Sequence, residues 1–183
     1  MEFNPLEYPK PDLASSQKEN SVPENWREVL EDKMFYAHEN AVPLVILQKP
    51  EDQLTEAEKK LWEKASIRVK TLAEYQALQA MLLRKQEHID DDIAHENAHA
   101  NKAESLGMNF HGYKVIVGYR RNGLSKEYFY LNSVEISTPN EWSAENDADA
   151  FKQVLLAPDE NGASVSSGLD HKMLDKLNRG ESL

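Results

Sequence analysis

The stretch that decides the fold is YKVIVGYRRNGLSKEYFYLNSVEI, residues 113–136. Two segments within it, 113–120 and 127–136, are rich in aromatic and β-branched residues, which favour strands. Between them stands Asn122-Gly123, a pair typical of the tight turns that join antiparallel strands. The pattern therefore predicts a β-hairpin.

Upstream of this hairpin, residues 54–106 contain no Gly and no Pro and are rich in good helix formers, so they are expected to be largely helical. Thr55 and Glu58 are spaced as a capping box at the start. The segment is too long for one ordinary helix, and the run Asp90–Asp92 offers N-caps for a second one. That last helix is expected to end at Gly107, a typical C-cap.

Downstream, residues 141–157 predict another helix, which Pro158 is expected to end. Ala148, Phe151 and Leu155 recur at helical spacing and are taken as its buried line. This helix therefore follows the hairpin directly and is expected to cover it.

The rest of the chain divides into tails and a short leading segment. Residues 1–25 hold four of the eight prolines and predict an extended or disordered arm. A short amphipathic helix is expected from Trp26 to Phe35, and a buried strand at 42–48. With the later elements these form one domain at 26–158, and the Gly- and Ser-rich residues 159–183 predict a flexible C-terminal tail.

Composition narrows the classes of protein. The 183 residues carry a net charge of -11, which argues against direct binding to nucleic acid and suits a basic protein substrate. The chain has no cysteine, so disulfides and thiol chemistry are excluded. It shows no secretory signal and no apolar run long enough to span a membrane, so we expect a cytoplasmic protein.

One motif in the upstream helical segment points to chemistry, because residues 95–99 read His-Glu-Asn-Ala-His. On a helix, His95 and His99 project from one face a turn apart, so their nitrogens can reach one Zn²⁺ at about 2.0–2.1 Å. Glu96 lies beside them, where its carboxylate can take a proton from a zinc-activated water. The motif predicts a zinc hydrolase with Glu96 as general base.

A catalytic zinc needs a third protein ligand. The metzincin pattern would place a histidine at position 105, but the residue is Ser105, so that class is excluded. Glu145 is the first candidate, because it would face inward on the downstream helix, and a buried carboxylate needs a partner or a cation. Asp149, one turn later, would accept the spare N–H of a zinc histidine. His111, before the hairpin, remains the alternative ligand.

The two helical motifs resemble those of ImmA/IrrE-type metallopeptidases. The downstream helix agrees in register with that family's signature at six positions: Glu145, Ala148, Phe151, Leu155, Leu156 and Pro158. Asp149 stands where the family usually has Asn, and Lys152 where it has a small residue. The resemblance implies that zinc is bound by both motif histidines and Glu145, that Glu96 is catalytic, and that the substrate is a DNA-binding repressor.

The residues and the resemblance together predict an α+β, zincin-like fold. A small antiparallel sheet containing the hairpin would pack against the helix of the His-Glu motif and against a following helix that bears the third ligand. The predicted function is a zinc-dependent peptidase that acts on a protein or peptide substrate. Two alternatives remain: a catalytically inactive metal-binding domain, and an adaptor that works through its long helices.

Overall fold

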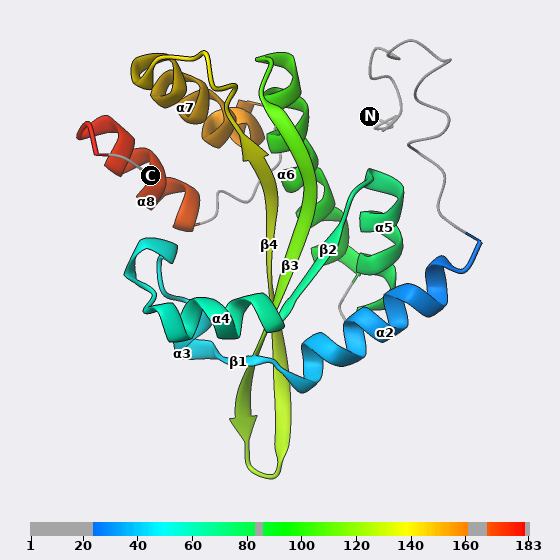
Figure 1. Cartoon of the computed structure of the whole chain (residues 1–183). Coiled ribbons are helices and arrows are strands. Elements are labelled where there is room, and N and C mark those ends of the chain that lie inside the picture. The colour runs from blue at the N-terminus through cyan, green and yellow to red at the C-terminus, as the bar shows by residue number, and fades with distance from the viewer. Residues whose placement is uncertain (1–23, 83–85, 161–167, 182–183) are drawn as a thin grey trace.

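The predicted hairpin is confirmed and forms the centre of the structure (Figure 1). In this computed structural model, which describes residues 24–82, 86–160 and 168–181, strands β3 (Asn109–Asn122) and β4 (Ser125–Ser137) pair antiparallel along their length. Gly123 has a φ of +63° in the turn between them. The exposed tip of the hairpin extends beyond the helices. These two long strands therefore make up most of the sheet.

The other edge of β3 carries two short strands, so the sheet is mixed and not antiparallel as predicted. Strand β1 (Val42–Pro43) pairs parallel to β3, and β2 (Ser66–Val69) pairs antiparallel to it. The predicted strand at 42–48 is wrong after its second residue, because the chain turns into helix α3 (Leu44–Leu47). This turn brings Leu47 directly against Gly118 of β3, where no side chain separates them.

The long segment 54–106, which was predicted to be largely helical, is interrupted by strand β2. Its residues Ile67 and Val69 are buried and alternate with half-buried neighbours, the period of a strand lying against β3. The capping box at Thr55 is confirmed. The break predicted at Asp90–Asp92 is wrong, because one helix runs through all three aspartates. Gly107 follows that helix with a φ of +81°, as predicted.

Helices cover both faces of the sheet. Helices α2 (Trp26–Glu39), α5 (Leu72–Met81) and α6 (Gln86–Ser105) share one apolar core with β2 and β3. On the other face, α3 and α4 (Glu56–Lys64) pack on a second core, and the short 3-10 helix η1 (Glu51–Gln53) lies between them in the chain. Among the described residues, no helix has both the length and the apolar character needed to cross a membrane.

The C-terminal part of the chain adds α7 (Ala144–Glu160) beside α6 and α8 (Gly168–Asn178) beside α7 (Figure 1). Helix α7 continues through Pro158, which was predicted to end it. Helix α8 forms within the region predicted to be a flexible tail. The predicted N-terminal arm, by contrast, lies almost wholly outside the described residues. The α6, α7 and α8 group is where the motif residues lie.

Gly112 of β3 offers a direct test of the packing between β2 and β3. Its φ is +135°, and a Cβ built there would overlap the backbone carbonyl oxygen of Val69. We expect Gly112→Ala to lower the free energy of unfolding by about 2 kcal/mol or more, since backbone strain and a steric clash add. Denaturant unfolding measures this.

The matched control is Gly123→Ala, which also places alanine at a positive φ but meets no atom within 4 Å. At a φ of +63° alanine lies in the left-handed region, which costs less than a φ of +135°, and it meets no clash, so the cost should be smaller. Equal costs for the two variants would contradict the packing described here.

Candidate metal centre

The motif histidines lie on the buried side of α6. His95 and His99 are each 5% exposed, Glu96 is 6% exposed, and the two imidazole rings are edge-to-face with centroids 4.7 Å apart. Small residues on this helix, among them the buried Ala103, allow α7 to approach closely. The four-residue spacing of the motif thus places two imidazoles together between α6 and α7.

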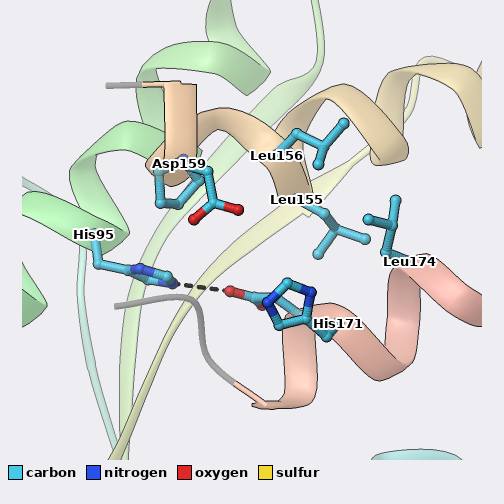
Figure 2. A pocket seen from close by; sticks show the side chains of 8 residues that line it. His95, Leu155, Leu156, Asp159, His171 and Leu174 are labelled. Carbon is cyan, nitrogen blue, oxygen red and sulfur yellow. Dashed lines mark hydrogen bonds and ion pairs between the residues drawn. The ribbon is translucent and has the colours of Figure 1, made fainter. Parts of the chain in front are cut away.

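Helix α8 also lies next to the two motif histidines. A small cavity of about 10 Å³ lies next to His95, and apolar side chains of α7 and α8 line it together with His171 and Asp159 (Figure 2). Asp170, in the first turn of α8, also lines this cavity and points its carboxylate toward the histidines. The last described helix therefore supplies an acid to the motif on α6.

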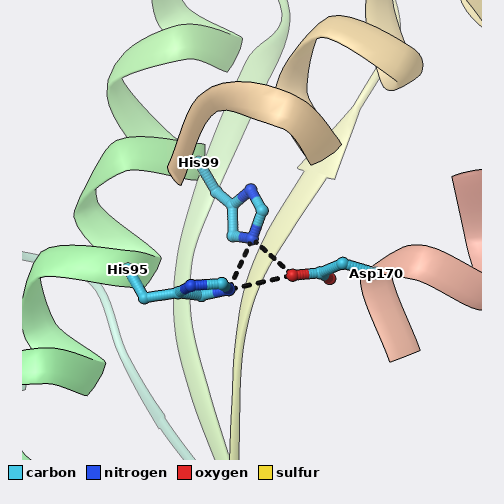
Figure 3. A group of neighbouring side chains, drawn as sticks. All are labelled: His95, His99 and Asp170. Atoms are coloured by element: carbon cyan, nitrogen blue, oxygen red, sulfur yellow. Dashed lines mark hydrogen bonds and ion pairs between the residues drawn. The ribbon is translucent and has the colours of Figure 1, made fainter. Parts of the chain in front are cut away.

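Three ligand atoms meet at this point (Figure 3). Oδ2 of Asp170 lies 2.9 Å from Nε2 of His95 and 3.3 Å from Nε2 of His99, and the two nitrogens are 3.1 Å apart. Ligands about 2.05 Å from a tetrahedral Zn²⁺ are about 3.3 Å from one another. The three atoms thus have nearly the spacing that a shared zinc ion would require.

The hydrogen-bonding state of His99 favours a cation among these atoms. Its Nδ1 lies 2.7 Å from the carbonyl oxygen of Val154, which can only accept, so Nδ1 carries the proton. In the neutral ring, Nε2 then presents a lone pair to the carboxylate of Asp170. Two lone pairs facing each other repel unless a proton or a metal ion lies between them. Two imidazoles and a carboxylate are also ordinary ligands of zinc, so the donor set fits this metal.

The pKa values show the same attraction for positive charge. Burial alone would lower the pKa of His99, but its hydrogen bond to Asp170 and the negative charges of Glu96 and Asp170 outweigh burial and raise it. Burial alone would raise the pKa of Asp170, yet the hydrogen bonds to His95 and His99 hold it well below the ordinary value. The cluster is therefore a site that attracts positive charge.

Glu96 has a different environment. Burial raises its pKa to about 7, although the charges of His99 and His95 act in the opposite direction. A carboxyl group with a pKa near neutrality can both accept and return a proton at physiological pH. Its proton affinity is therefore the one expected of a general base at neutral pH.

The predicted third ligand, Glu145, lies outside this cluster. It is exposed in the first turn of α7, and Asp149, the predicted partner of a zinc histidine, is exposed as well. The alternative ligand, His111, is exposed on β3 and its Nε2 lies 2.7 Å from the hydroxyl of Ser137. The structure brings none of these three to the motif histidines and brings Asp170 instead.

The phase of α7 explains the displacement of Glu145. The face against α6 carries Ala150 and Val154. Of the predicted line through Ala148, Phe151 and Leu155, only Phe151 packs against this core. Both lines are apolar at helical spacing, so periodicity alone does not choose between them. Shifting the buried face moves Glu145 into solvent.

Asp170 was missed because it lies in a Gly- and Ser-rich region that predicts a tail. The sequence did contain one indication of a helix with an inward-facing acid. Asp170, Leu174 and Leu177 are spaced four and three residues apart, the period of a helix with one inward face. An acid at the start of such a face is a candidate ligand.

Comparison with known proteins adds no family to this description. No protein-family profile, curated protein sequence or solved structure matches the chain.

Replacing each candidate side chain in turn tests which of them would hold a zinc ion. We expect Asp170→Asn to weaken zinc binding by more than the roughly 10–100-fold that loss of an outer-shell partner costs. Glu145→Gln and His111→Ala should bind zinc like the unaltered protein. Competition with a chromophoric chelator measures all three. Weak binding in Glu145→Gln with normal binding in Asp170→Asn would reverse the assignment.

Zinc binding should also depend on pH. The ligands must be unprotonated, and a raised pKa at His99 means that protons compete with zinc at a higher pH than they do at an ordinary histidine. We expect zinc affinity to fall as the pH is lowered from about 8 to about 6. Titration calorimetry in buffers of different ionisation enthalpy should record proton release. A flat affinity with no proton release would contradict the role of His99.

Proposed function

We propose that this chain is a zinc-dependent peptidase whose metal is held by His95, His99 and Asp170. The observation that supports it most is the meeting of three ligand atoms within 3.3 Å, beside a buried glutamate. A zinc ion bound there would polarise a substrate carbonyl and lower the pKa of water. Three protein ligands leave a position for water or substrate, as in catalytic zinc sites.

Two side chains near the proposed metal would supply the proton transfer and the hydrogen bond that hydrolysis also needs. Glu96, with a pKa of about 7, would take the proton from the attacking water and pass it to the leaving amine. His171 lines the cavity beside Asp170 and is exposed, so its ring can donate a hydrogen bond to the oxygen of the attacked carbonyl. A proton carrier and a hydrogen-bond donor therefore flank the proposed metal position.

The sheet supports a peptide as the substrate. In the described residues β4 is paired with β3 alone, so the opposite edge of β4 offers backbone donors and acceptors to an extended chain. The net charge of -11 would favour a basic partner. The family resemblance adds a DNA-binding repressor as the first substrate to test. A zincin-like arrangement of the motif helix and the sheet is part of this proposal.

Substitution of the general base tests the proposed mechanism. We expect Glu96→Gln to retain stoichiometric zinc and to lower the rate of peptide hydrolysis by about 100-fold or more, since the isosteric amide cannot accept the proton. Hydrolysis is followed by mass spectrometry on a proteome-derived peptide library, with zinc content measured by elemental analysis. The control is Glu104→Gln, an exposed position two turns further along α6.

The outcomes separate the alternatives. A Glu96→Gln variant that hydrolyses peptides at the unaltered rate would exclude this role for Glu96. Stoichiometric zinc with no cleavage of any library peptide would favour a non-catalytic metal-binding domain. Absence of bound zinc would favour an adaptor that acts through its helices.

A further inference from the structure

Helix α7 contains a backbone irregularity at the point where it meets His99. In an α-helix the carbonyl of residue 154 accepts a hydrogen bond from the amide of residue 158. Here that residue is Pro158, which has no N–H, although the helix continues through it to Glu160. The carbonyl of Val154 therefore lacks its usual helical donor.

The side chain of His99 takes the place of that donor. Its Nδ1 donates to the Val154 carbonyl oxygen at 2.7 Å, in a buried contact between residues 55 positions apart. Pro158 itself is buried and lines the small cavity next to His95. The missing N–H and the imidazole that replaces it thus lie beside the metal position.

We propose that Pro158 is a positioning residue for the zinc site and acts through the carbonyl of Val154. By leaving this carbonyl without an amide donor, Pro158 lets it bind Nδ1–H of His99. The tautomer is then fixed, and the Nε2 lone pair points at the metal position. An amide at position 158 would compete for the same carbonyl and would allow the ring to carry its proton on Nε2, the nitrogen that zinc needs.

His95 provides a contrast within the same structure. Its Nδ1 is buried and has no hydrogen-bond partner among the described residues. Of the two motif imidazoles, only His99 is held by the backbone of α7. The tautomer of His99 therefore depends on this one carbonyl. Through it, Pro158 can affect the metal position although it makes no hydrogen bond to either imidazole.

The test compares two residues at position 158 that differ in a single N–H. Pro158→Ala supplies the amide, and Pro158→lactic acid, introduced by nonsense suppression with the α-hydroxy acid, has the same methyl group but an ester oxygen in place of the N–H. The ester lies on the carbonyl of residue 157, so the Val154 carbonyl is chemically unchanged. Circular dichroism confirms that both variants are folded.

The first readout is the tautomer of His99 in the metal-free protein, from ¹⁵N shifts of the imidazole at an alkaline pH where the ring is neutral. We expect Nδ1–H in the unaltered protein and in the lactic acid variant, and a substantial Nε2–H population in Pro158→Ala. The second readout is zinc affinity, which should fall by about 10-fold or more in Pro158→Ala alone, the size of effect seen when outer-shell partners of a metal are lost.

An unchanged Nδ1–H tautomer in Pro158→Ala, or equal zinc affinities in the two variants, would overturn the proposal. This inference rests on the proposed zinc site, but the tautomer is read without metal and without substrate. Failure of the peptidase proposal would leave the tautomer result intact. A protein that binds no zinc yet shows the tautomer change would support the role of Pro158 in orienting His99 and contradict the proposed function.

Discussion

The site between α6 and α8 depends on the contact between Nε2 of His99 and the carboxylate of Asp170, for which the neutral imidazole has no proton to donate. His99 uses its Nδ1 proton on the backbone of α7, so its Nε2 meets the carboxylate of Asp170 as one acceptor facing another. A positive charge must hold these atoms together, although they belong to residues 71 positions apart in the chain. Other anchors of α8 are the buried Leu177 and the ion pair of Lys176 with Asp52. Docking of α8 therefore brings Asp170 to the motif histidines.

Local patterns in the sequence were enough to predict the parts of the structure that local physics determines. The hairpin follows from strand-forming residues on either side of Asn122-Gly123, and the end of α6 follows from Gly107. The juxtaposition of His95 and His99 needs only a helix and a spacing of four. These features hold because the interactions that form them lie within a few residues along the chain.

Features set by packing between distant segments were not predictable in the same way. Strand β2 lies in a region whose composition favours helix, and it becomes a strand because Ile67 and Val69 complete the core against β3. The buried face of α7 is chosen by its fit to α6, which removes Glu145 from the site. Asp170 joins the histidines only because α8 folds back over α7. The position of the proposed third ligand thus depends on tertiary packing, whereas the motif on α6 is set by local sequence.

Placement of the acidic ligand on α8 has a consequence for the order of events during synthesis. Because the chain is made from its N-terminus, the motif histidines on α6 leave the ribosome before Asp170 does. At that stage both imidazoles are present without the carboxylate of Asp170, the third atom of the proposed metal site. A chain shortened before Asp170 would therefore keep both motif imidazoles and lose the acid of the proposed metal site, so the proposed chemistry would require the last helix of the described structure.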